Sequence, residues 1–398
     1  MKKYHRLLLI IVSVISLILF LIYRHEYNRL HYVLEVFNFF GQPCNFSDLQ
    51  TSDYTLKQYD WGPQPMWQEL DNGYVYSAFL TGKIEVKAIA LPLDVKKVPR
   101  NCYFWFEDKK KPLTGKFTFS KMLNTNLSSL TPYFFYCTAP TIDNTPYAVS
   151  FTYKAKRESE MKKILLVDVQ ITNHKIPNIN TTICVSPTTF SKKKIVEFFS
   201  FHRLVGVESF IFYTKDIPYR LSKLLMNLSK RLDAHVAFLP WNFPKNDIDV
   251  AQSIIEYDCL FRTYGRSRFI ITLNLNEYLV PTTSYTINEL LNDLENQVHR
   301  LSLPVQKFCI NNVSNNKPLA LQNYDVVRDI NHSDIRFIYK NVEDNNFNTN
   351  TVDKTRASVH KYVKCGIYSQ TTTDYSMQKF SIDFTRSTLV QLLLHNQL

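Results

Sequence analysis

The chain has 398 residues, a length that predicts two domains and a tail. Its 45% hydrophobic and 14% aromatic residues exclude a disordered protein, and its 8 glycines include no glycine-rich phosphate loop, which excludes a P-loop nucleotidase. The formal net charge of +12 gathers partly beside an N-terminal apolar segment and is otherwise spread out, with no nucleic-acid recognition motif, so we expect no nucleic-acid partner.

The N-terminal segment 7–23 is apolar apart from Ser13 and Ser16, and residues 1–6 before it are basic. As a helix its 17 positions span roughly 26 Å, which suits the thinner membranes of the early secretory pathway. The basic flank predicts a cytoplasmic tail and a lumenal body. A cleaved signal peptide is the alternative, but no small-x-small cleavage site follows the apolar core. We expect a transmembrane signal anchor and a single-pass type II membrane protein of the Golgi or endoplasmic reticulum.

Residues 24–70 are expected to form a stem, and residues 71–175 a β-rich module. In the module, apolar and polar residues alternate and turn residues recur about every ten positions, which predicts an antiparallel β-sandwich-like fold. Its exposed aromatic residues are candidates for sugar contacts, and a module that only packs and spaces is the alternative. The expected strands are 74–79, 84–91, 102–106, 116–119, 133–137, 147–153 and 164–171.

Cysteines and N-x-[ST] sequons both agree with a lumenal glycoprotein. Seven cysteines allow up to three disulfides and one left over, and their spacing matches no zinc motif. Cys184 and Cys259 fall inside expected core elements, where buried thiols are the alternative. The six sequons begin at Asn45, Asn126, Asn180, Asn227, Asn312 and Asn331.

The stretch 183–281 alternates short apolar runs with segments of helical spacing. The expected strands are 183–186, 209–213, 235–239 and 268–273, and the expected helices are 191–205, 221–232 and 248–264. This alternation predicts a mostly parallel sheet with helices on both faces, in which ligands bind beyond the carboxyl ends of the strands.

Beyond residue 281 the pattern is less regular. It predicts a helix over 287–303, strands over 305–313 and 358–368, and an asparagine-rich flexible loop over 340–354 that is a candidate acceptor-site lid.

Six short motifs follow one another in the stretch 183–281. They are Cys184–Pro187, Val196–Phe198, His202–Val207, Phe210–Tyr213, Asp258–Arg262 and Asn274–Pro281. In this order they resemble the catalytic core of glycosyltransferase family 92. The resemblance implies a GT-A domain over residues 180–398, an α/β fold with a Rossmann-like mixed sheet. It also implies a hexosyltransferase that moves a sugar, typically galactose from UDP-galactose, onto a glycan or glycoprotein acceptor.

The resemblance places a metal-binding D-x-D at the end of the last expected strand, but here Asn274 and Asn276 replace both aspartates. Asparagine keeps an oxygen ligand and loses the negative charge, and a unit-charge pair at 4 Å is worth about 4 kcal/mol at an effective dielectric near 20. Mn²⁺ is therefore implied by the family and weakly supported by these residues. Glu277, which follows, is predicted either to act in catalysis and supply a ligand or only to brace the loop.

The resemblance also suggests residues around the donor. Asp258 and Arg262 lie one turn apart and are predicted to be near the donor, Asp258 as a catalytic residue and Arg262 as a donor contact. The alternative is an i,i+4 helix pair worth about 0.3–0.5 kcal/mol. Asp216, Gln252 and Arg356 are further candidate donor contacts.

Two positions near the C-terminus depart from the family pattern. Tyr368 stands where the family tends to have a histidine, and the terminal basic element is reduced to residues 395–397, His-Asn-Gln. His395 is a candidate metal or phosphate ligand, and a bystander near the terminus is the alternative.

An inverting transfer needs a carboxylate base, for which Asp334, Glu343 and Asp344 lie in the right part of the chain with no motif to choose among them. Three hypotheses remain open. The chain is a metal-dependent transferase, or a metal-independent one in which Arg262 or Arg356 stabilises the diphosphate, or a catalytically impaired member that binds glycans or partners.

Overall fold

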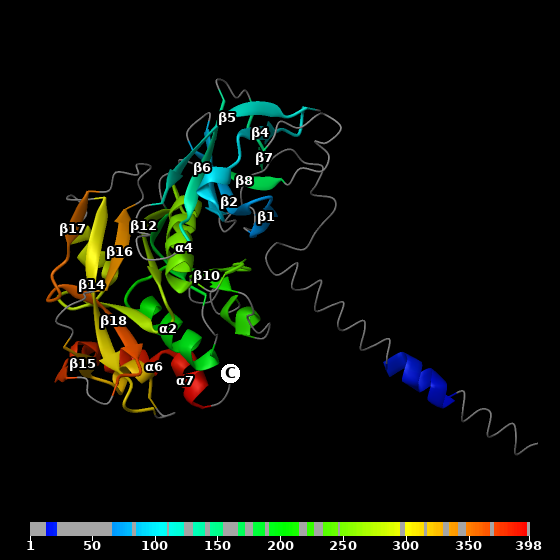
Figure 1. The fold of residues 1–398 in the computed structure, drawn as a ribbon. Coiled ribbons are helices and arrows are strands. Elements are labelled where there is room, and N and C mark those ends of the chain that lie inside the picture. The colour runs from blue at the N-terminus through cyan, green and yellow to red at the C-terminus, as the bar shows by residue number, and fades with distance from the viewer. Residues whose placement is uncertain are drawn as a thin grey trace, which may run out of the picture. The chain divides into compact units, whose positions relative to one another are not determined.

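The structure is a computed structural model that describes residues 13–21, 66–81, 85–109, 111–122, 130–139, 144–153, 166–171, 178–187, 191–214, 221–226, 234–245, 247–294, 299–313, 317–328, 334–340, 348–366 and 370–395. The chain divides into two compact units, Met1–Lys57 and Gln58–Leu398. In the first, residues 13–21 form an exposed α-helix (Figure 1). None of the helices described is long and apolar enough to cross a membrane. The predicted anchor, 7–23, extends beyond the described residues.

The β-rich module begins the second unit. Its strands are β1 (Gln68–Leu70), β2 (Gly73–Thr81), β3 (Glu85–Pro92), β4 (Asn101–Trp105), β5 (Leu113–Lys121), β6 (Tyr133–Thr138), β7 (Ala148–Thr152) and β8 (Val167–Ile171), and η2 (Val95–Lys97) is a short 3-10 helix. They form one sheet in the order β1-β2-β3-β6-β5-β4-β7-β8, which a parallel β2–β8 pairing closes on itself. The remaining pairings are antiparallel, as the alternating sequence predicts.

A disulfide between Cys102 and Cys137 crosses the interior of this module. Gly115 of β5 faces it, and a Cβ at Gly115 would lie 2.5 Å from Sγ of Cys137 and 3.0 Å from Sγ of Cys102. A side chain at this position would therefore collide with the disulfide, which explains a glycine in the middle of a strand.

The second sheet has a parallel half and an antiparallel half. Four strands, β9 (Ile179–Val185), β10 (Ser209–Thr214), β11 (His235–Pro240) and β12 (Ser267–Leu273), run parallel in the order β11-β10-β9-β12. The helices α2 (Lys192–Leu204) and α4 (Ile248–Arg262) connect them in the expected alternation, and residues 221–226 are helical within the expected helix 221–232 (Figure 1). The mixed α/β fold is confirmed.

The antiparallel half contains the differences from the expected elements. The predicted helix 287–303 is α5 (Ile287–Leu294), and β14 (Arg300–Cys309) begins inside its expected range. The first residues of β14 alternate between polar and apolar and pair with β16 (Ile335–Lys340). The sequence periodicity did not predict β16. The expected loop 340–354 contains β17 (Thr349–Thr351), which pairs with β14. Here pairing across the sheet decides the backbone conformation and local pattern does not.

The remaining strands and helices complete this half. They are β13 (Glu277–Pro281), β15 (Asp325–Val327), β18 (Ala357–Val363), β19 (Thr371–Thr373), η5 (Leu319–Leu321), η6 (Ser376–Phe380), α6 (Ser381–Arg386) and α7 (Thr388–Leu394). β18 lies between β13 and β14, and α2 packs against β13, α6 and α7 (Figure 1).

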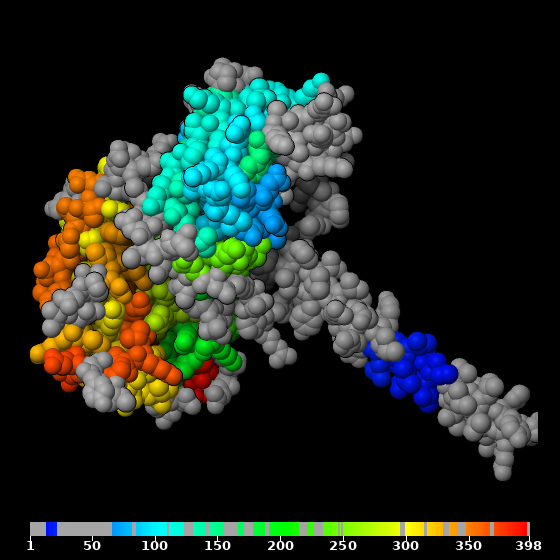
Figure 2. All heavy atoms as spheres, in the orientation of Figure 1, coloured from blue at the N-terminus to red at the C-terminus, as the bar shows by residue number. Residues whose placement is uncertain are grey.

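α4 joins the module to the second sheet. Phe261 of α4 contacts Phe79 of β2 and Phe134 of β6, with ring centroids 5.5 and 5.7 Å apart. In Figure 2 the light-green atoms of this part of the chain lie against the blue and cyan atoms of the module. Two further disulfides, Cys184–Cys259 between β9 and α4 and Cys309–Cys365, bring the number to the three that the cysteine count allows.

Within α2, Glu197 is a buried carboxylate, 2% exposed. Its Oε2 accepts a hydrogen bond from the backbone N–H of Leu319 at 3.0 Å, and its Oε1 lies 3.9 Å from Nζ of Lys193. Burial raises the pKa of Glu197 from 4.5 to about 7, although the bond from Leu319 and the charge of Lys193 act to lower it.

This raised pKa predicts a pH-dependent stability. Because the folded state binds the proton more tightly than the unfolded chain, the contribution of Glu197 is fully present below the unfolded pKa and is lost as pH rises through the folded one. In denaturant titrations, Glu197→Gln should remove a fall of about 3 kcal/mol in unfolding free energy between pH 4.5 and 7. Glu289→Gln, on the exposed face of α5, should keep that fall. An unchanged pH profile in Glu197→Gln would contradict the assignment.

Candidate functional site

The four parallel strands of the second sheet end along one edge. Ser186 follows β9, Thr214 ends β10, Pro240 ends β11, and Asn274 follows β12. The backbone N–H of Ser186 bonds the carbonyl of Leu273 at 3.0 Å, which continues the β9–β12 pairing to the edge. Ligands of such sheets bind beyond this carboxyl edge. It is therefore the candidate site.

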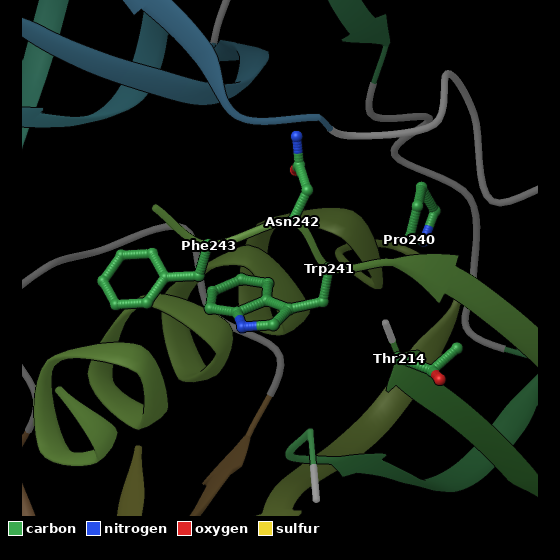
Figure 3. Close-up of a pocket in the computed structure, with 5 residues that line it drawn as sticks. All are labelled: Thr214, Pro240, Trp241, Asn242 and Phe243. Carbon is green, nitrogen blue, oxygen red and sulfur yellow. The ribbon is translucent and has the colours of Figure 1, made fainter. Parts of the chain in front are cut away.

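A pocket of ≈ 320 Å³ opens at this edge, lined by Thr214, Pro240, Trp241, Asn242 and Phe243 (Figure 3). The indole of Trp241 stacks on the ring of Phe243 with centroids 5.4 Å apart, and both side chains are largely buried. Asn242 Oδ1 accepts from the backbone N–H of Trp67 at 2.9 Å and its Nδ2 donates to the Trp67 carbonyl at 3.2 Å. The pocket thus has an aromatic wall, made by Trp241 and Phe243, and polar side chains from Thr214 and Asn242. Ligand pockets commonly combine aromatic walls with a few polar groups.

Two buried hydroxyl groups lie at the same edge. Oγ of Ser186 and Oγ1 of Thr214 have no hydrogen-bond partner among the residues that the structure describes, and both side chains are at most 4% exposed. A buried hydroxyl without a partner costs about 1–3 kcal/mol. Both residues lie at the carboxyl edge, and Thr214 also lines the pocket.

Asn274 and Asn276 form the turn between β12 and β13. The side-chain Nδ2 of Asn274 donates to Oε1 of Glu277 at 3.2 Å, and its backbone N–H donates to Oε2 at 3.0 Å. Asn276 Nδ2 donates to the carbonyl of Tyr362 on β18 at 2.9 Å, and Tyr362 N–H donates back to the Asn276 carbonyl. Both amides are therefore used to fix the turn.

Glu277 is fully buried and pairs with two cations. Nη2 and Nε of Arg336 lie 2.6 and 3.0 Å from its two oxygens, and Nζ of Lys361 lies 3.6 Å from Oε1. Burial acts to raise the pKa of Glu277, but the charge and hydrogen bonds of Arg336 outweigh it and hold that pKa below its ordinary value. Glu277 is thus an ionised, internally neutralised carboxylate.

The residues present do not fit a Mn²⁺ site. Asn274 and Asn276 offer only neutral amide oxygens, and both oxygens of Glu277 are bonded to Arg336. No group of three His, Cys, Asp or Glu side chains in the described part of the chain is arranged to hold a metal. The carboxylates that hard divalent cations prefer are missing from this turn.

Asp258 and Arg262 form a buried ion pair on α4. Arg262 Nε donates to Oδ2 of Asp258 at 2.9 Å and its Nη2 donates to Oδ1 at 3.1 Å, with both side chains at most 1% exposed. Tyr213 of β10 donates its hydroxyl to Oδ2 at 2.6 Å. This geometry favours the helix-pair alternative over a direct donor contact.

The other predicted residues are dispersed. Gln252 is half-buried in the first turns of α4, which starts close to the pocket residues, and Asp216 lies outside the described residues. Arg356 is 3.7 Å from Asp293 of α5. It directly precedes β18, five residues before Lys361, so its backbone lies roughly 17 Å from the Glu277 end at about 3.3 Å per residue. His395 is exposed at the end of α7. Their functional roles stay predictions.

Several family-like motifs brace one another. The Tyr213 hydroxyl bonds Asp258, and Cys184 forms its disulfide with Cys259. Nε2 of His202 accepts from the backbone N–H of Leu279 in β13 at 3.2 Å, and burial lowers the pKa of His202 to about 3, so that this nitrogen is an unprotonated acceptor. The motifs therefore hold β9, β10, α2, α4 and β13 in place behind the site.

Sequence-based prediction missed Arg336, Lys361 and the pocket residues Thr214 and Trp241. Arg336 and Lys361 reach Glu277 from β16 and β18, about 60 and 80 residues later in the chain. Of these residues only Thr214 had a local signal that could have revealed it, since it directly follows the expected strand 209–213.

Comparison with known proteins identifies the family. The sequence profile of glycosyltransferase family 92 matches residues 179–388, slightly more than half of the chain. The chain belongs to glycosyltransferase family 92. This membership supports a transferase. A comparison with curated protein sequences gives no significant match.

The solved structures that match this chain do so at low identity and low TM-score. HddC from Yersinia pseudotuberculosis has 11% identity and a TM-score of 0.27 over 52% of this chain and 100% of its own. A putative glucose-1-phosphate thymidylyltransferase from Bacillus anthracis, solved with a sucrose, has 9% identity and a TM-score of 0.27 over 40% and 71%. TarS of S. aureus, solved with UDP-GlcNAc, has 9% identity and a TM-score of 0.29 over 55% and 71%.

The buried pair on α4 leads to a stability prediction. Arg262→Met leaves the charge of Asp258 buried without its partner, so we expect a loss of about 3–5 kcal/mol in unfolding free energy, measured by denaturant titration. The double variant Asp258→Asn with Arg262→Met removes both charges and keeps an acceptor for Tyr213, so it should recover most of this loss. A double variant as unstable as the single one would contradict a structural pair, and loss of nucleotide binding in a stable double variant would favour the donor contact.

Proposed function

We propose that this family 92 member transfers a hexose, galactose from UDP-galactose, onto a glycan or glycoprotein acceptor. The observation that carries the proposal is the aromatic pocket at the carboxyl edge of the sheet that the family profile covers, with buried hydroxyls that have no partner among the described residues. We place the uracil ring in this pocket beside Trp241, and we propose that the buried Thr214 hydroxyl rotates to form a hydrogen bond with it. An aromatic wall suits a flat base, because each stacked base gains about 1–3 kcal/mol.

The diphosphate and the sugar then lie toward β12. Ser186 and Asn274 follow neighbouring strands of the edge, next to the pocket strands β10 and β11. We keep Gln252 as a candidate donor contact, because α4 begins a few residues after the pocket residue Phe243. Asp216, which lies outside the described residues, also stays a candidate.

We propose Asp334 as the catalytic base. It precedes β16, which runs antiparallel to β12, so it lies at the carboxyl end of β12 beside Asn274. Its side chain is 39% exposed, and Lys361 Nζ is 3.5 Å from its Oδ2. The carboxylate would take the proton of the acceptor hydroxyl while that oxygen attacks the anomeric carbon and UDP leaves, which inverts the configuration. Glu343 and Asp344, the other candidates, lie outside the described residues.

We further propose a lumenal location in the Golgi or endoplasmic reticulum, with segment 7–23 as a type II membrane anchor. Three disulfides support an oxidising compartment. Two of the sequon asparagines, Asn180 and Asn312, are exposed in the structure, which supports a glycoprotein.

A second candidate function is a family member that binds nucleotide or glycan without turnover. The favouring observation is Glu277, the retained carboxylate of the motif, which is buried and neutralised by Arg336. A bound cation cannot use a carboxylate that is already paired in this way.

A transfer assay decides between the two. The full-length protein, incubated with UDP-galactose and a glycan panel, should release UDP and form a galactosylated product. Asp334→Asn should lower kcat about 100-fold or more while UDP binding persists, since it removes the base and keeps the fold. UDP binding without any turnover would instead establish the second candidate, and equal kcat in Asp334→Asn would remove Asp334 as the base.

The pocket assignment has a matched test on one strand. Thr214→Val and Ser209→Ala each remove a buried hydroxyl that lacks a partner in the described part of β10 and its surroundings, at opposite ends of the strand. Neither should lower the melting temperature. Only Thr214→Val should weaken UDP binding in calorimetry, by about 0.5–1.5 kcal/mol for a lost hydrogen bond. Equal UDP affinity in both variants would place the base elsewhere.

A further inference from the structure

The turn at Asn274 is surrounded by charged side chains from neighbouring strands. Glu277 begins β13, Arg336 lies in β16, and Lys361 lies in β18. Asp334 is 3.5 Å from Lys361 and 3.8 Å from Lys307 of β14. These five side chains form one connected charge cluster at the carboxyl end of β12.

The net charge of this cluster is positive, whereas the net charge of the residues around a metal site is negative. Three cations and two carboxylates give 3 − 2 = +1. With aspartates in place of Asn274 and Asn276 the same cluster would carry +1 − 2 = −1, a charge that attracts a divalent cation. With the two amides it attracts an anion directly. The two asparagines and the cations therefore act in the same direction.

We infer that Lys361, supported by Arg336, takes the place of a divalent cation and binds the diphosphate of a nucleoside diphosphate without metal. The inference rests on the proposed function. Lys361 is the cross-strand partner of Glu277, so its side chain is on the same face of the sheet, and it remains 24% exposed. Its two carboxylate contacts are long, at 3.5 and 3.6 Å, which leaves its ammonium able to bond phosphate oxygens.

Arg336 has a different part. Its bidentate bond neutralises Glu277, and without that bond Lys361 would be the main counter-charge of a buried carboxylate. Arg336 thus keeps the charge of Lys361 available for an incoming anion. It is a positioning residue, 15% exposed.

The spacing of the sheet fits such a ligand. The pocket lies at β10 and β11, and Asn274 follows β12, which is two to three strands away in the order β11-β10-β9-β12. At about 4.8 Å per strand this is roughly 10–14 Å. An extended nucleoside diphosphate with its base in the pocket spans that separation.

Other cations predicted from sequence are placed less well. Arg262 is buried and bonded to Asp258, and Arg356 lies at the other end of the β13–β18 pair beside Asp293. Neither is at the carboxyl end of β12. In the metal-independent hypothesis, Lys361 and Arg336 therefore replace Arg262 and Arg356 as the cations that stabilise the diphosphate.

The test is calorimetric titration of the full-length protein with UDP and with uridine. UDP should bind equally well in EDTA and in Mn²⁺. Lys361→Met should weaken UDP binding roughly tenfold or more and leave uridine binding unchanged, because uridine lacks the phosphates. Lys340→Met, at the opposite end of β16, is the matched control and should bind UDP as the native protein does. Thr214→Val should weaken both ligands.

A second variant keeps the inference testable if Lys361→Met fails to fold. Asn274→Asp with Asn276→Asp should weaken UDP binding in EDTA and make binding depend on Mn²⁺. UDP binding that requires Mn²⁺ in the native protein, or equal UDP affinity in Lys361→Met, overturns the inference and leaves the proposed function standing. Absence of UDP binding in both EDTA and Mn²⁺ overturns the proposed function as well.

Discussion

The charge of Glu277 is the constraint on which the site depends. A carboxylate with no exposed surface must be paired or protonated, and here the pairing comes from Arg336 on β16 and Lys361 on β18. The same carboxylate bonds the backbone N–H of Asn274 and so fixes the turn after β12. One buried charge thus ties the end of the parallel half of the sheet to two strands of the antiparallel half. Any ligand at this edge meets a surface whose charge is set by that pairing.

Behind the carboxyl edge of the parallel strands, the motifs shared with family 92 make contacts within the protein that stabilise the fold and do not involve a ligand. Asp258 accepts from Tyr213 and pairs with Arg262 inside the core, and His202 holds the backbone of Leu279. These contacts link residues that periodicity alone would assign to separate elements. A motif residue buried in this way is better explained by its partners in the fold than by contact with a sugar nucleotide.

The strands and helices that the sequence predicted correctly share strong local signals. Period-two runs bounded by turn residues marked the module strands, and alternating apolar runs and helices marked β9 to β12. The range 287–303 was mispredicted because Leu290, Leu291 and Leu294 continue into a segment whose apolar spacing fits helix and strand alike. β16 and β17 were missed since their pairing with β12 and β14 is long-range.

The residues of the site were predicted or missed for the same reason. Asn274, Asn276 and Glu277 were found because they are contiguous and follow a strand, and Asp334 entered as one of three carboxylates. Arg336 and Lys361 were not found, since only cross-strand register brings them to Glu277. Residues contributed by one strand end are visible in sequence, whereas a counter-charge contributed by other strands is not.

The β-rich module takes part in the site more directly than a spacer would. Trp67 and Tyr76 of the module contact Trp241 with centroids 6.0 and 5.1 Å away, and the Tyr76 hydroxyl donates to the carbonyl of Pro240 at 3.3 Å. The backbone N–H and carbonyl of Trp67 also form two hydrogen bonds with the side-chain amide of Asn242. The aromatic wall of the pocket is therefore supported from both parts of the second unit. Because a stacked base needs a rigid wall, the proposed binding of a base in this pocket would depend on the packing of the module against β11 and α4.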